Sequence, residues 1–145
     1  MFTPELRVRG FLQSRVMDTS GSDIVKGVLS VQEEVDGNTK YGWKRPEAVA
    51  SKVAEELGEL CEALKKGDSK QLEAEVGDIL FSVLNLARYC GVDPVRALRE
   101  AKSRFERRVA IARELAAREH RRLEELSAAE LDRLWEEAKL RLRNT

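Results

Sequence analysis

The chain contains little histidine, cysteine or proline. Its 145 residues include one histidine, two cysteines and three prolines. His120 lies in the polar stretch REHRR, so neither a Ser/His/Asp triad nor a zinc site with several histidines is expected, and His120 is predicted to be an exposed helix residue. Cys61 and Cys90 have no CxxC spacing and are predicted to be reduced thiols in the core, because a free cysteine packs like a small hydrophobe.

The sequence also lacks a net charge and a long apolar run. Lys plus Arg and Asp plus Glu both number 26, so there is no general attraction to nucleic acid. The opening stretch MFTPELRVRGF mixes charges and has no apolar segment long enough for a signal peptide or a spanning helix. We therefore expect a cytoplasmic protein without a nucleic-acid or membrane partner, built as a single domain over residues 1–145.

No segment shows the alternation typical of a strand, and 36% of the residues are charged, which favours an all-α fold. Caps and helical spacing predict five helices. They run from about Ser22 to Val35, from Pro46 to Lys66 with Gly67 as cap, from Asp68 or Ser69 to before Gly91, from Pro94 to near Arg121, and from Ser127 with Glu130 in a capping box. The stretch 36–43 is predicted to be a loop. Short links imply an antiparallel helical bundle, in which the apolar stripes face the core.

Two stretches, EELGEL (55–60) and EVGDIL (75–80), repeat the order acid, aliphatic, glycine, acid, aliphatic. Glu56 and Glu59 project one turn apart from one helix, as do Glu75 and Asp78 from the next. If the two helices pack antiparallel, the four carboxylates can converge. Such a group repels itself unless a cation lies within it, and oxygen-only ligands suit Mg²⁺, with Mn²⁺ as a substitute.

The glycines within these two stretches are unusual for helix interiors. Gly58 and Gly77 each cost on the order of 1 kcal/mol relative to alanine. Their missing side chains can let the two backbones, or a bound phosphate chain, come close. From the spacing alone a solvated acidic face is as good an interpretation as a metal site, and the doubled pattern with its glycines favours the metal site.

Basic residues gather on the predicted helix from Pro94. Arg104 and Arg108 share a face at i, i+4, near Lys102 and Arg107. Guanidinium groups match phosphate geometry and disperse its charge, so this face suits a polyphosphate. The alternative is ordinary Arg/Glu alternation on a surface helix.

Three segments together resemble the MazG nucleoside triphosphate pyrophosphohydrolases, especially their carboxy-terminal catalytic domain. They are KVAEELGELCEAL (52–64), LEAEVGDILFSVLNLARYCGVDPVRALREAKSRFERRV (72–109) and LSAAELDRLWEEAKLR (126–141). The likeness covers about 41–141, whereas residues 1–40 match poorly. It implies an all-α NTP pyrophosphatase-like fold, Mg²⁺-dependent hydrolysis of a nucleoside triphosphate to the monophosphate and pyrophosphate, and assembly as a homodimer or homotetramer.

The resemblance also implies roles for individual residues. The metal ligands would be Glu56, Glu59, Glu75 and Asp78, the catalytic carboxylates Glu55 and Glu59, and the substrate-binding residues Lys52, Arg104, Arg108 and Trp135. The segment RFERR starts with Arg104 where the family usually has lysine. A tryptophan on an amphipathic helix is more often a core residue, which is the alternative for Trp135. Rival functions are hydrolysis of dUTP or phosphoribosyl-ATP on the same fold, and a non-catalytic helical interaction module.

Overall fold

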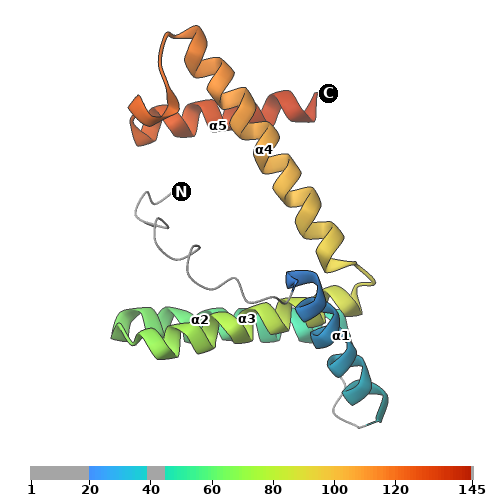
Figure 1. Ribbon diagram of the computed structural model, residues 1–145. Coiled ribbons are helices and arrows are strands. Elements are labelled where there is room, and N and C mark those ends of the chain that lie inside the picture. Colours follow the sequence, from blue (N-terminus) through green and yellow to red (C-terminus); the bar gives the residue numbers. More distant parts are fainter. Residues whose placement is uncertain (1–19, 39–44, 145) are drawn as a thin grey trace. The chain divides into compact units, whose positions relative to one another are not determined.

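The computed structural model describes residues 20–38 and 45–144, and all of its regular structure in these ranges is helical (Figure 1). The elements are α1 (Gly21–Asn38), α2 (Pro46–Lys66), α3 (Ser69–Tyr89), α4 (Pro94–Arg118), the short 3-10 helix η1 (Leu123–Glu125) and α5 (Ala128–Arg143). The prediction of an all-α fold is confirmed. Within the described ranges, no helix combines the length and the apolar character needed to cross a membrane.

The chain divides into two compact units. One contains α1, α2 and α3 and extends to Ala97, and the other contains α5, η1 and α4 from Leu98 onward. The prediction of one domain over residues 1–145 stays a prediction.

Local sequence signals define most of the helix ends. Gly67 caps α2 in the left-handed conformation, with φ of 69°, and its N–H bonds to the carbonyl of Ala63. The Asp68 side chain accepts the first free N–H groups of α3. Ser127 and Glu130 form the predicted capping box of α5. The boundaries predicted for these three helix ends are confirmed.

Two predicted helix ends differ from the structure. The loop prediction is wrong for its first residues, because α1 continues through Asp36 and Gly37 to Asn38; the rest of that loop, 39–43, includes no described residue. Helix α4 ends at Arg118, and His120 follows it in a turn with φ of 56°. His120 is exposed as predicted but does not belong to a helix.

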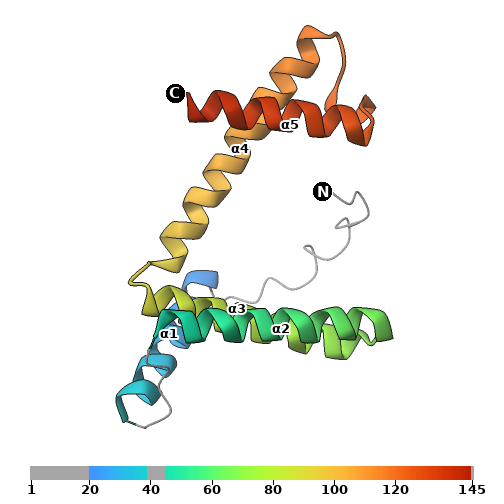
Figure 2. The same cartoon turned by 180° about the vertical axis from the view of Figure 1, so that it is seen from behind.

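Helices α2 and α3 form an antiparallel hairpin, and α1 packs against α3 (Figures 1 and 2). The hairpin link consists of Gly67 and Asp68, so the two helices lie side by side over their lengths. Helix α1 is joined to α3 by the buried Gln32, whose Nε2 donates to the carbonyl oxygen of Phe81 at 2.9 Å. This unit carries the acidic stretches of both α2 and α3.

The apolar stripes of the hairpin are only partly covered. Leu57 and Leu64 on α2 and Val76 and Leu80 on α3 are exposed. One helix packed across a two-helix layer covers one side of it, which leaves these residues facing outward. The prediction that the stripes face a core is therefore wrong for these positions.

The cysteines share this environment. Cys61 and Cys90 are free, as predicted, but both are exposed. The prediction that they are core thiols is wrong, because Cys61 lies on an exposed position of α2 and Cys90 is the exposed C-cap residue of α3.

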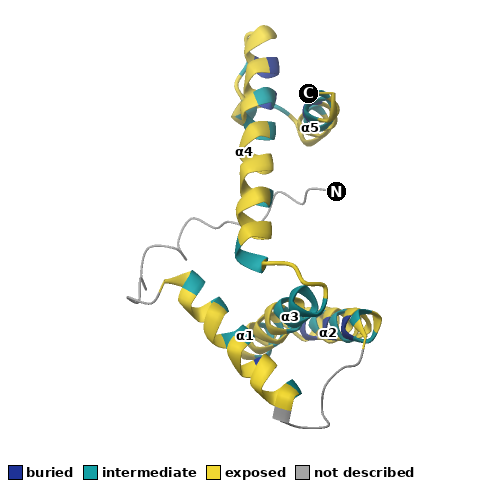
Figure 3. Cartoon of the chain, turned by 90° about the vertical axis from the view of Figure 1, so that its right-hand side faces the viewer, coloured by how far each residue is buried: buried dark blue, intermediate teal, exposed yellow. Residues whose placement is uncertain are grey.

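In the other unit, α5 packs on the carboxy-terminal half of α4. Ala112, Leu115 and Ala116 of α4 form a buried cluster with Leu134 of α5. The alanines let the helices approach closely around Leu134, which is 1% exposed. Figure 3 shows α4 exposed over most of its remaining surface.

Candidate metal centre

Three carboxylates from the α2–α3 hairpin meet in space. Glu56 of α2 and Glu75 and Asp78 of α3 each offer an oxygen, and these oxygens all lie within 4.8 Å of one another. Glu56 is buried, Glu75 is half-buried and Asp78 is exposed. The antiparallel hairpin creates this meeting, because it brings the acidic turn of α2 beside that of α3.

Glu59 lies outside this group of three but close to it. The charge of Glu56, then burial, then the charge of Glu75 raise the pKa of Glu59. The structure thus brings together three of the four predicted ligands and leaves the fourth as their neighbour.

Among the described residues, Lys52 is the cation found in an ion pair with a carboxylate of the cluster. Its Nζ lies 3.0 Å from an oxygen of Glu56 and 3.3 Å from one of Glu55. These hydrogen bonds, the one to Glu56 first, raise the pKa of Lys52. Glu55 itself is exposed on α2. Lys52 therefore neutralises part of the negative charge of the cluster.

The three clustered carboxylates fit a hard divalent cation. The Oε2 atom of Glu75 is buried and has no hydrogen-bond partner in the described part of the chain. An unsatisfied carboxylate oxygen beside two further carboxylates is costly unless a cation compensates it. Oxygen-only donors suit Mg²⁺ or Mn²⁺ and disfavour ions that prefer nitrogen or sulfur.

The glycines in the acidic stretches do not bring the two helix backbones together. A Cβ atom built on Gly58 or Gly77 meets no other atom within 4 Å. The prediction of close backbone approach is therefore wrong. An open groove beside Gly58 is lined also by Glu55, Glu59, Glu62, Lys66, Gln71 and Glu75. The close approach of a phosphate chain to the glycines stays a prediction.

A pocket of about 290 Å³ adjoins the cluster on the same hairpin. It is lined by Val49, Lys52, Glu56, Asp78, Phe81, Ser82 and Asn85. Ser82 and Asn85 are lining residues that the sequence motifs did not indicate. The available signal was their spacing, since positions four and seven residues after Asp78 lie on the same face of a helix.

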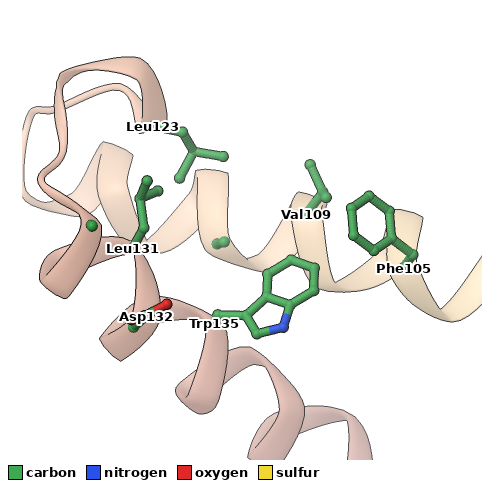
Figure 4. A pocket seen from close by; sticks show the side chains of 8 residues that line it. Phe105, Val109, Leu123, Leu131, Asp132 and Trp135 are labelled. Carbon is green, nitrogen blue, oxygen red and sulfur yellow. The ribbon is translucent and has the colours of Figure 1, made fainter. Parts of the chain in front are cut away.

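The remaining predicted substrate residues belong to the α4–α5 unit. Trp135 is half-buried and packs on Phe105, with ring centroids 5.2 Å apart and an interplanar angle of 56°. The Cζ atom of Arg108 lies 6.0 Å from the Trp135 ring centroid, and Arg104 is exposed on α4. Trp135 borders an apolar groove of about 220 Å³, together with Leu123 and Leu131 (Figure 4). It is neither a buried core residue nor a fully exposed one.

The fold and the cluster define an all-α protein with a carboxylate site suited to a divalent cation between antiparallel helices. Residues 44–110 match the MazG nucleotide pyrophosphohydrolase domain. The chain belongs to this family.

Curated relatives extend the match beyond that domain. The chain is 43% identical over 114 residues to the nucleoside triphosphate pyrophosphohydrolase/pyrophosphatase MazG of Thermotoga maritima. The aligned stretch covers 77% of this chain and 44% of that protein. It is 30% identical over 104 residues to the nucleoside triphosphate pyrophosphohydrolase of Escherichia coli K12, an alignment that covers 70% of this chain and 40% of that protein. The uncharacterized protein YpjD of Bacillus subtilis is 39% identical over 75 residues, an alignment that covers 43% of this chain and 68% of that protein. The chain thus spans less than half the length of the first two relatives.

Proposed function

We propose that this chain hydrolyses nucleoside triphosphates to the monophosphate and pyrophosphate with Mg²⁺. The observation that carries the proposal is the meeting of Glu56, Glu75 and Asp78 on the α2–α3 hairpin in a member of the MazG family. The names of the T. maritima and E. coli relatives support nucleoside triphosphates as the substrate class.

In this proposal Glu56, Glu75 and Asp78 hold the cation, and Glu59 adjoins them as a fourth oxygen donor. Mg²⁺, or Mn²⁺ in its place, supplies Lewis-acid stabilisation of the phosphate oxygens when bound. Water attacks the α-phosphorus and the pyrophosphate group leaves. Glu55 or Glu59, the carboxylates outside the group of three, accepts the proton of the attacking water.

Basic and aromatic residues bind the substrate in this proposal. Lys52 sits beside Glu56 and offsets charge on the departing pyrophosphate. Arg104 and Arg108 contact phosphate oxygens, and Trp135 contacts the nucleotide base. The support for this pair of roles is that Arg108 lies over the face of Trp135, which combines a phosphate-binding group with a stacking surface.

We also propose that the chain acts as a homodimer or homotetramer. The support is the exposed apolar residues on α1 and α3, including Val31, Val76 and Leu80, because monomeric proteins rarely leave such surfaces uncovered. A cytoplasmic location and the absence of a nucleic-acid partner stay predictions from the sequence.

Product analysis tests the proposed reaction. The purified protein is incubated with Mg²⁺ and a panel of ATP, GTP, CTP, UTP, dUTP, dCTP and phosphoribosyl-ATP, and the products are separated by chromatography. We expect monophosphate and pyrophosphate in equal amounts, and no reaction in EDTA. Release of orthophosphate contradicts the proposed cleavage position, and no reaction with any substrate favours a non-catalytic interaction module. Exclusive use of dUTP or phosphoribosyl-ATP favours the rival substrates.

A further inference from the structure

Part of the pocket beside the acidic cluster is lined by uncharged side chains. Glu56 and Asp78 belong to the cluster, and Lys52, the cation among the lining residues, already pairs with Glu56 at 3.0 Å. The other lining residues are the apolar Val49 and Phe81 and the neutral polar Ser82 and Asn85. This part of the pocket suits an uncharged ligand group with hydrogen-bonding atoms better than it suits a phosphate.

The amide of Asn85 is held in one orientation. Its Oδ1 accepts a hydrogen bond from an Nη atom of Arg88 at 2.8 Å. Arginine can only donate, so the oxygen of the amide is the atom turned to Arg88. Among the described residues none accepts from the Nδ2 of Asn85. The group that Asn85 has available for a ligand is therefore an N–H donor.

Arg88 is itself fixed by α1. Its guanidinium forms a hydrogen-bonded ion pair with Asp36, and the hydroxyl of Tyr89 donates to the same carboxylate at 2.8 Å. Both side chains of the ion pair are largely buried, with 21% and 22% exposed. Burial alone would raise the pKa of Asp36, but the hydrogen bonds from Arg88 and Tyr89 outweigh burial and lower it. The carboxylate thus stays charged and holds Arg88 in place.

We propose that Asn85 is a specificity-determining residue that donates a hydrogen bond to the nucleoside part of the substrate, and that Asp36 and Arg88 are positioning residues for it. The inference rests on the proposed function, because it places the phosphates at the carboxylate cluster and the sugar of the nucleoside in the adjoining pocket. At about 290 Å³ the pocket is slightly smaller than typical ligand sites, which suits a sugar rather than a whole nucleotide.

Kinetics of Asn85 variants test the assignment. Asn85→Leu removes the donor at similar size, and Asn85→Asp replaces it with an acceptor that still pairs with Arg88. For both we expect the KM for the nucleoside triphosphate to rise on the order of tenfold, the scale of one hydrogen bond, while kcat changes little. Asn144→Asp, at the exposed C-cap of α5, is the matched control and should leave KM unchanged.

Inorganic tripolyphosphate separates the nucleoside from the phosphates. It carries the phosphate chain without sugar or base, so its inhibition constant should be the same for the wild type and for Asn85→Leu. If tripolyphosphate inhibition weakens as much as KM rises, the pocket binds phosphate and the inference is overturned.

The KM of a further variant tests the positioning roles of Asp36 and Arg88. Asp36→Asn should raise KM in the same direction as Asn85→Leu with little change in kcat, because Arg88 then no longer fixes the amide. Combined with Asn85→Leu it should add no further increase in KM, since both changes act through one hydrogen bond. An independent, additive increase would contradict the positioning role.

The failure of this inference differs from the failure of the proposed function. A wild-type protein that releases no pyrophosphate refutes the proposed function. An active wild type whose KM is unaffected by both Asn85 changes refutes only the nucleoside contact. A loss of kcat together with an altered sedimentation coefficient also overturns it, because Asn85 would then support the fold or a subunit interface.

Discussion

Among the clustered carboxylates, Glu56 is the one that water can reach least. It is 7% exposed, whereas Asp78 is exposed, and it contacts both the cluster and Lys52. A buried carboxylate depends on its partners for charge compensation far more than an exposed one does. A substitution of Glu56 should therefore change the stabilisation of the protein by a bound metal ion more than the stability of the metal-free protein.

We expect Glu56→Gln to reduce hydrolysis about 100-fold or more, because loss of a ligand should cost at least as much as loss of a group supporting one. In EDTA its Tm should stay near that of the wild type, since the change also relieves repulsion with Glu75 and Asp78. The rise in Tm on adding Mg²⁺, measured by calorimetry, should disappear. The exposed Glu73→Gln is the control on α3. A Glu56→Gln protein that keeps the Mg²⁺-dependent shift would refute the metal site.

Gly77 allows a second test at the residue scale. The space around it is open, so Gly77→Ala should raise the free energy of unfolding by about 0.5–1 kcal/mol through helix propensity. Gly91→Ala should instead lower it by about 1–2 kcal/mol, because Gly91 has φ of 66°. Urea denaturation measures both.

The same glycine variant tests the phosphate interpretation. If a phosphate chain passes over Gly77, Gly77→Ala is more stable but hydrolyses its substrate more slowly. Unchanged activity would mean that Gly77 has no part in the site.

At the scale of the element, helix ends were the features most accessible to sequence analysis. Gly67 and Ser127 act through hydrogen bonds to residues three or four positions away, so the local sequence contains the whole interaction. The α1–α3 joint is different. Asp36 and Arg88 are 52 residues apart, and neither the spacing nor the composition of the chain indicates that they meet.

The start of α5 should respond to acid. Hydrogen bonds from the Ser127 backbone, then from Arg121, lower the pKa of Glu130 to about 2. A lowered native pKa contributes stability above the unfolded value of about 4.5, and this contribution is lost as the pH falls toward 2. We expect Glu130→Gln to have a lower Tm than the wild type at pH 6 and a difference that shrinks toward pH 2.

Thermal unfolding followed by circular dichroism between pH 6 and pH 2 measures this difference. Glu124→Gln, an exposed position in η1, is the control and should follow the wild-type curve. A difference between Glu130→Gln and the wild type that stays constant with pH would contradict the assignment.

At the scale of the whole molecule, the exposed apolar residues of α3 are the main surface that a single chain leaves uncovered. Leu80 is 60% exposed on a helix that has no buried residue of its own. We expect sedimentation equilibrium to show a homodimer or homotetramer, and Leu80→Glu to shift it toward the monomer because a charge would be buried in the contact.

Ser103→Glu adds the same charge at an exposed position of α4 and serves as the control. A wild-type chain that sediments as a monomer would contradict the proposed assembly. Equal dissociation by both variants would mean that overall charge, rather than the α3 surface, governs association.

Sequence alone determined the helical class, most helix ends and the spacing of the acidic pairs, because each depends on interactions within a few residues or on the helix period. Only the tertiary structure decided that Glu56 meets Glu75 and Asp78 while Glu59 stays beside them, that Asn85 is oriented from α1 through Arg88, and that Cys61 and Cys90 lie outside a core. The physical reason is that a helical stripe specifies which residues share a face, whereas burial and pairing depend on which other element packs against that face and at what height.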